Sequence, residues 1–303
     1  MSKLRTRLVA VLGLAGSLLG AGTAHAYCRT NACDATKGDS CYRDENECWQ
    51  GGAPLYWPTD CVSFAVQKAG SPANEIGAPD FEAVIRTAFN TWQNAVCDGD
   101  TRPSIQAESF GQVECDQVEY NLKAANANIY MFRDDVWLNE EDASQALALT
   151  TVWHDHKTGQ IRDVDVEVNG TPSSHVTNGE VTDGADLLSI ITHETGHFLG
   201  LDHSDVTGSV MFAYYNPGDD NLRELTEDDA AGICEIYPAD RKPDSTSCSP
   251  RRGFATQCDP PAMSSGGCSV TTVGSSAPNA FLLLLAPLAA WSMVRRRRRS
   301  SRN

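Results

Sequence analysis

The histidines between residues 193 and 203 have the types and the spacing of metal ligands. The segment His193-Glu194-Thr195-Gly196-His197-Phe198-Leu199-Gly200-Leu201-Asp202-His203 has the form H-E-x-x-H-x-x-G-x-x-H. Residues four apart on an α-helix lie on one face, so His193 and His197 can direct ring nitrogens at one ion. Gly200 can adopt a left-handed backbone that ends the helix and turns His203 back toward that ion. Three nitrogen ligands with an open fourth position are typical of catalytic zinc sites.

Two further residues complete this candidate site. Glu194 follows the first histidine, beside the shared ligand face, where it can reach a water on the ion without binding the ion itself. We therefore predict hydrolysis by zinc-activated water, with Glu194 as the general base. Met211 follows His203 closely, and a methionine in a tight turn there would form an apolar floor under the imidazoles. From spacing alone, an ordinary core methionine fits equally well.

The elements that must position these residues are predicted from apolar periodicity. A first helix follows Pro79-Asp80, with apolar residues at helical spacing up to Trp92. A second begins at Asp186 and carries the first two histidines, and a third begins at Thr226 as N-cap with acidic residues in its first turn. Strands are predicted at 55–57, 62–66, 104–107, 128–132, 147–153 and 160–168, the last with one apolar and one charged face.

Residues 193–215 resemble the metzincin zinc metalloproteases, and in particular the matrixins of the bacterial branch. Ser204, directly after the third histidine, is typical of matrixins, and the likeness extends over residues 53–238. It implies an α/β (α+β) fold with a twisted, mostly parallel five-stranded sheet, three helices and an active-site cleft. Ala213 stands where matrixins usually have proline, so the wall of the specificity pocket is expected to differ.

The same resemblance assigns roles to individual residues. His193, His197 and His203 would bind one catalytic zinc ion, Glu194 would be the catalytic base, Met211 would form the Met-turn, and Tyr215 would lie near the specificity pocket. The implied activity is a zinc metalloendopeptidase acting on extended protein or peptide substrates. The alternative is a non-catalytic, zinc-stabilised surface binding or adhesion domain, against which Glu194 argues because a structural site has no use for that carboxylate.

The charge distribution excludes one class of partner. Nine of the 24 basic residues lie in the two terminal segments, which contain no acidic residue, so the central part sets 15 basic against 40 acidic residues and carries about −25. A body this acidic repels phosphate backbones, and we expect no nucleic-acid binding. The pairs Asp98/Asp100 and Asp219/Asp220 are candidate Ca²⁺ ligands, with solvated acidic loops as the alternative.

Both ends of the chain are predicted to direct its location. Residues 1–26 have a basic start, an apolar run and an A-x-A-like cleavage site, which is a signal peptide for export. A metalloprotease domain with a Cys-rich N-terminal extension is predicted at 27–240, a Pro/Ser/Gly-rich linker at 241–267, and a tail at 268–303. The tail's order of Cys268, apolar run and arginine cluster resembles the myxobacterial surface-sorting tail, with a plain membrane anchor as the alternative. We expect a monomer at the cell surface, anchored to the outer membrane, or secreted.

The eleven cysteines favour disulfides in an exported protein. Eight lie in the body of the domain, and their connectivity cannot be read from spacing because eight cysteines allow about 105 pairings. Cys248 and Cys258 are expected to pair with each other in the linker, which would form an extended tether. Cys268 is left over, and a role in processing or anchoring would account for it.

Overall fold

The computed structural model describes residues 26–137, 146–171, 176–179, 184–258 and 280–284. Residues 1–25 of the predicted signal peptide, Cys268 and the terminal arginine cluster lie outside these residues. Among the described residues, no helix is long and apolar enough to cross a membrane.

The centre of the protein is a twisted sheet whose strands follow the order β7-β8-β6-β4-β5. Their bounds are β4 Cys61–Gln67, β5 Gln106–Val113, β6 Ile129–Arg133, β7 Ala148–His154 and β8 Ile161–Asn169. The β4–β5, β4–β6 and β6–β8 pairs are parallel, and β7 runs antiparallel to β8. The predicted mostly parallel five-stranded sheet is therefore confirmed. The strand predicted at 104–107 is displaced, because β5 begins at Gln106 and continues to Val113.

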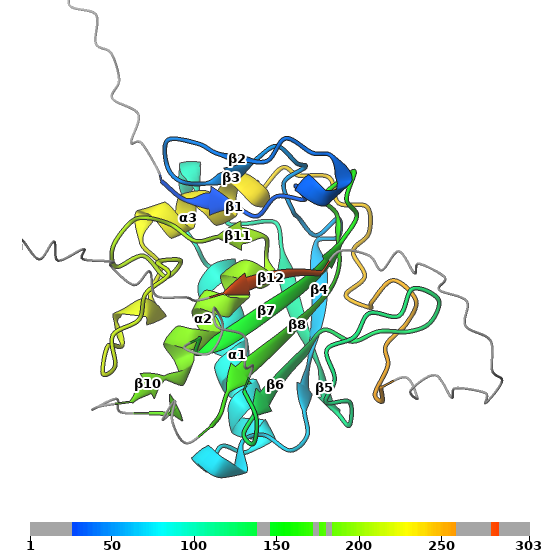
Figure 1. Ribbon diagram of the computed structural model, residues 1–303, viewed down its shortest axis with the longest axis vertical. Coiled ribbons are helices and arrows are strands. Elements are labelled where there is room, and N and C mark those ends of the chain that lie inside the picture. The colour runs from blue at the N-terminus through cyan, green and yellow to red at the C-terminus, as the bar shows by residue number, and fades with distance from the viewer. Residues whose placement is uncertain (1–25, 138–145, 172–175, 180–183, 259–279, 285–303) are drawn as a thin grey trace, which may run out of the picture.

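A sixth strand from the tail extends this sheet. β12, Ala280–Leu284, pairs antiparallel with the outer edge of β7, from Ala280 opposite Trp153 to Leu284 opposite Leu149 (Figure 1). This segment belongs to the predicted tail, 268–303, so part of the tail joins the sheet of a domain that was predicted to end at residue 240. The physical reason is that an edge strand presents a row of unpaired N–H and C=O groups, which an extended apolar segment can satisfy.

The three predicted helices are all present: α1 Ala78–Gln93, α2 Leu187–Phe198 and α3 Glu227–Ile236. The apolar face of α1 is buried, and the indole Nε1 of Trp92 donates to the Thr192 carbonyl of α2 at 2.8 Å. Thr226 caps α3 as predicted, in a capping box with Asp229. In Figure 1, α1 and α2 lie together on one face of the sheet.

Short elements frame these layers. β1 Cys28–Arg29 pairs with β11 Leu201–Asp202, β2 Tyr42–Arg43 pairs with β3 Trp49–Gln50, and β9 Val176–Thr177 pairs with β10 Ala185–Asp186. Single 3₁₀ turns occur at Ala35–Lys37, Pro72–Asn74, Asp98–Asp100 and Asn221–Arg223. The pairing of β1 with β11 places the N-terminal segment against the residues that precede His203.

Five disulfides connect the described cysteines, and they correct one expectation. The pairs are Cys28–Cys48, Cys33–Cys41, Cys61–Cys248, Cys97–Cys234 and Cys115–Cys258. Cys248 and Cys258 thus bond to β4 and to the segment after β5, and not to each other. The chain up to Cys258 is fastened to the domain, so the part of the predicted tether from 241 to 258 is not free.

The charged face of β8 is buried and not solvated. Asp163 and Asp165 have no exposed surface, and the Asp165 carboxylate accepts from the backbone N–H groups of Ile129 and Glu119. Burial, together with the neighbouring carboxylates, raises the pKa of both aspartates well above the usual range. The alternating pattern therefore predicted the strand correctly but not its environment.

Candidate metal centre

The start of α2 is fixed by Asp186, the residue predicted to begin this helix. Its carboxylate accepts from the Ser189 backbone N–H at 2.8 Å, and Arg223 donates to both carboxylate oxygens at 2.8 and 2.7 Å. The Tyr215 hydroxyl accepts from the Asp186 backbone N–H at 2.9 Å. These contacts hold the helix in one orientation and, with it, the two histidines near its end.

The structure brings His193, His197 and His203 together. One ring nitrogen from each lies within 4.8 Å of the other two, and the Nε2 atoms of His197 and His203 are 3.3 Å apart. His193 and His197 are buried, with 3% and 1% of their surface exposed. The rings of His193 and His197 stand at 82° to each other, so they converge from different directions.

Backbone carbonyls orient the first two rings. The Nδ1 atom of His193 lies 2.6 Å from the Val210 carbonyl oxygen, and that of His197 lies 2.9 Å from the Leu201 carbonyl oxygen. Because a carbonyl oxygen can only accept, each Nδ1 carries the proton and each Nε2 offers a lone pair. The Nε2 of His193 is buried and has no hydrogen-bond partner.

The three imidazoles are neutral at neutral pH. Burial is the main cause, and together with the charge of a neighbouring imidazole it lowers the pKa of each to about 3. Neutral imidazole is the form that binds a metal ion. Three neutral nitrogen donors and a buried nitrogen without a partner fit a zinc ion in chemistry and number.

Glu194 lies directly beside this cluster. Its side chain is 1% exposed, its Oε2 accepts from the Thr150 hydroxyl at 2.5 Å, and its Oε1 is buried without a partner. Burial raises the pKa of Glu194 to about 8, although the Thr150 hydrogen bond lowers it. A divalent cation on the histidines would favour the ionised carboxylate, which is the state that accepts a proton.

Gly200 forms the turn after α2, and Met211 packs beneath the helix. Gly200 has φ +104°, and a Cβ there would lie 2.7 Å from the Leu55 carbonyl oxygen, so glycine is required. Met211 is 1% exposed and packs under α2, where a Cβ on Gly196 would lie 2.3 Å from its Sδ. The Asp229 carboxylate holds this turn by accepting from the Met211 backbone N–H at 3.1 Å.

Comparison with known proteins identifies the family. The matrixin family profile matches residues 56–238, more than half of the chain. The chain belongs to the matrixin family. Matrixins are zinc metalloendopeptidases, and the match covers all the site residues described above.

Individual relatives cover this matrixin in part. It is 42% identical over 196 residues to metalloendoproteinase 1-MMP of Arabidopsis thaliana, an alignment covering 60% of this chain and 44% of that protein. It is 39% identical over 191 residues to human matrix metalloproteinase-16, covering 63% and 29%. It is 46% identical over 61 residues to rat matrilysin, covering 20% and 22%. The chain therefore spans less than half the length of each of these three relatives.

Tyr215, predicted to lie near the specificity pocket, and the candidate calcium ligands Asp219 and Asp220 are held by hydrogen bonds and an ion pair near the start of α2. Tyr215 is half-buried, and its hydroxyl donates to the Asp219 carbonyl while accepting from Asp186, so it ties a loop to the start of α2. Asp219 accepts from Asn221, and the Asp220 carboxylate lies 3.9 Å from the Arg223 guanidinium. Among the described residues, the remaining groups with metal-ligand proximity contain Cys61 with Cys248 or Cys115 with Cys258, whose sulfurs are joined in disulfides and do not serve as thiolate ligands.

Sequence reasoning missed Thr150 as a partner of Glu194. Thr150 lies inside a continuous buried strand, and nothing in its neighbourhood along the chain distinguishes it from Thr151. The contact arises because β7 lies across from α2, which local sequence does not encode.

Proposed function

We propose that this matrixin is a zinc-dependent endopeptidase of extracellular protein substrates. The observation that carries the proposal is the convergence of three neutral imidazoles next to a buried carboxylate oxygen that has no partner. His193, His197 and His203 would hold the ion. A bound zinc ion supplies a Lewis acid that polarises a peptide carbonyl and lowers the pKa of water.

The chain's own residues perform the proton transfers in this proposal. Glu194 Oε1 accepts a proton from the attacking water and delivers it to the leaving amine. Thr150 donates to the other carboxylate oxygen and holds Glu194 in one rotamer. Met211, fixed by Asp229, supports the histidines from below, and Tyr215 borders the specificity pocket next to the start of α2.

The edge of β7 is where we place the substrate. β7 carries Thr150, the partner of Glu194, so the strand at this edge contacts the proposed base directly. β12 already pairs there in antiparallel orientation, which supports a peptide adding to the sheet by main-chain hydrogen bonds. Such a substrate is extended, and its amino-terminal side runs toward the His154 end of β7.

Glu194→Gln tests the proposal. Glutamine is isosteric and its carbonyl oxygen can still accept from Thr150, so we expect the variant to fold and keep zinc. Loss of a general base lowers kcat by about 10²- to 10⁴-fold. The measurements are kcat/KM on a fluorogenic peptide mixture and zinc content by elemental analysis. Glu227→Gln, at an exposed position of α3, is the matched control.

The alternative of a zinc-stabilised binding domain gives a different result in the same experiment. Wild-type protein would then carry zinc, melt at a lower temperature after chelation and cleave nothing. If the Glu194 variant lost zinc together with activity, the role assigned to Glu194 as base would be wrong.

We also propose export and attachment through the tail. Two observations support this proposal. The five disulfides suit an oxidising compartment, and they use ten of the eleven cysteines, so that Cys268 is the remaining one. Intact-mass measurement of surface-fraction protein distinguishes the two tail hypotheses, because a sorted chain lacks Arg295 to Arg299 and an anchored chain keeps them.

Calcium binding at Asp98/Asp100 is a separate proposal. A thermal melt that does not change in millimolar calcium would refute it.

A further inference from the structure

The N-terminal lobe, residues 27–53, is a rigid structure built around the β2–β3 hairpin. Cys41 and Cys48 directly precede the two strands, and their disulfides to Cys33 and Cys28 hold both. The hairpin turn is closed by Asp44, whose carboxylate accepts from the backbone N–H groups of Asn46 and Cys48 at 2.9 and 3.0 Å. Side chains on this hairpin are therefore preorganised.

This lobe is fastened beside the candidate metal centre. β1 pairs with β11, and Thr30 adds two hydrogen bonds, from its N–H to the Gly200 carbonyl at 3.0 Å and from its hydroxyl to the Leu201 carbonyl at 2.9 Å. The lobe has a second contact with the domain, where the Asp39 carboxylate lies 3.3 Å from the His156 imidazole in the β7–β8 turn. The lobe thus contacts both the segment leading to His203 and the end of the substrate edge.

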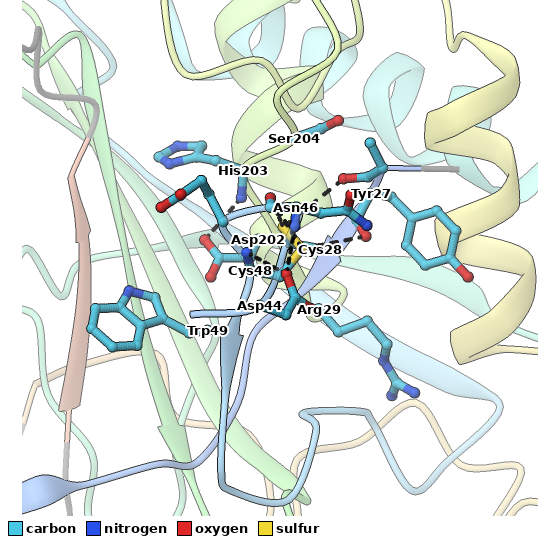
Figure 2. The surroundings of a disulfide bond; sticks show 12 residues. Tyr27, Cys28, Arg29, Asp44, Asn46, Cys48, Trp49, Asp202, His203 and Ser204 are labelled. Carbon is cyan, nitrogen blue, oxygen red and sulfur yellow. Dashed lines mark hydrogen bonds between the residues drawn. A yellow bond between two sulfur atoms is a disulfide. The ribbon is translucent and has the colours of Figure 1, made fainter. Parts of the chain in front are cut away.

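An arginine and an aromatic ring are exposed on the lobe. Trp49 is 38% exposed, and the Arg43 guanidinium lies over its indole at 4.6 Å. Figure 2 shows the Trp49 indole and the His203 imidazole projecting toward the same side of the β1–β11 pair. Within the described part of the chain, the Arg43 guanidinium forms no ion pair, and it donates to the Glu47 carbonyl at 2.6 Å.

Arg43 and Trp49 lie directly opposite each other in the β2–β3 pair. The Arg43 guanidinium is therefore held next to the Trp49 indole, as a cation in a protein body that is otherwise strongly acidic.

The direction of a peptide on β7 decides which of its residues meet the lobe. A segment antiparallel to β7 has its amino-terminal side opposite Trp153, as Ala280 of β12 does. The β7–β8 turn follows at this end, and it is the turn that the lobe contacts through Asp39 and His156. Residues before the scissile bond therefore run toward the lobe.

We propose that Arg43 and Trp49 form a subsite that binds an acidic residue on the amino-terminal side of the scissile bond. This inference rests on the proposed function, since it names a specificity of the same site. The indole contacts the aliphatic part of the substrate side chain and holds the guanidinium in place, and the guanidinium pairs with the carboxylate. An exposed ion pair replaced by a like-charge contact changes binding by about 3- to 10-fold.

The test compares peptide libraries that carry Glu or Lys at each of three positions before the cleaved bond. With the zinc-loaded full chain, we expect kcat/KM to favour Glu by about 3- to 10-fold at one position. Arg43→Glu should reverse this preference, with KM changing more than kcat. Trp49→Ala should weaken it, whereas Trp49→Phe should keep it. Arg102→Glu, an equal charge change at an exposed loop outside the lobe, should leave it unaltered.

The outcomes separate this inference from the proposed function. If the wild-type protein cleaves peptides and has the same preference for Glu as the Arg43→Glu variant, the subsite is refuted. The proposed endopeptidase activity is not affected by that result. Wild type that cleaves nothing refutes the endopeptidase, and the subsite is then decided by fluorescence anisotropy of labelled Glu and Lys peptides. Binding that favours Glu in wild type but not in Arg43→Glu supports the subsite, and equal binding overturns it.

Discussion

Replacing Gly196 by alanine probes the contact between α2 and the methionine below it. The new Cβ would lie 2.3 Å from Met211 Sδ and 2.8 Å from Trp92 Cζ2. Non-bonded carbon contacts are normally about 3.5–4.0 Å, so both neighbours would have to move. Neither has free space, because Met211 is 1% and Trp92 0% exposed and the Trp92 indole is hydrogen-bonded to Thr192.

The expected cost follows from two opposing effects. Overpacking a close-packed core destabilises the folded protein by about 1–3 kcal/mol, whereas replacing glycine by alanine within a helix stabilises it by about 1 kcal/mol. We therefore expect Gly196→Ala to lower the free energy of unfolding by up to about 2 kcal/mol. Zinc affinity should fall as well, since the Val210 carbonyl that orients His193 belongs to the residue next to Met211.

Guanidinium unfolding, with and without a chelator, measures both effects. A double-mutant cycle with Met211→Ala isolates the contact, because the alanine leaves a cavity that the added methyl of residue 196 partly fills. The double variant should be more stable than the sum of the two single changes predicts by at least about 1 kcal/mol. Additivity within about 0.5 kcal/mol would refute the reasoning.

Two further predictions concern the start of α2 and the tail. Although burial raises it, the Arg223 guanidinium and the Ser189 donors lower the pKa of Asp186 below its usual value, so this ion pair stabilises the fold at neutral pH. That contribution is lost as the pH falls from about 4 through the lower folded-state pKa, and calorimetry should show a steeper loss of Tm there than in Asp186→Asn. Ending the chain at Cys258 removes β12 from the β7 edge, and kcat/KM on a peptide longer than the cleft should rise. An unchanged kcat/KM would mean that β12 does not compete with substrate.

Much of the local structure could be predicted from the residues themselves. The bounds of the three helices follow from apolar periodicity and from the caps at Asp186 and Thr226, because helix geometry and capping depend on neighbours within one or two turns. The same locality makes the positions of His193, His197 and Gly200 predictable from spacing. The left-handed Gly200 is found where the motif requires it.

Only the tertiary structure decided which distant segments meet. Cys61 pairs with Cys248 across 187 residues, and Cys115 pairs with Cys258 across 143 residues. Cys248 and Cys258 lie much closer to each other in the sequence, yet they do not pair with each other. A disulfide needs two Cα atoms within about 7 Å, and the path of the whole chain determines that distance. The contact of Thr150 with Glu194 has the same origin, since it depends on which strand lies opposite α2.

The contacts of the N-terminal lobe with the rest of the domain could not be predicted from the sequence either. The sequence predicted a Cys-rich N-terminal extension, but the pairing of β1 with β11 is what places this lobe against the segment that leads to His203. Likewise, alternation along β8 predicted a strand with a charged face, yet that face is covered, and Asp165 is bonded to Ile129 and Glu119. Residue pattern determines which faces an element has, whereas packing of the complete chain determines what each face touches.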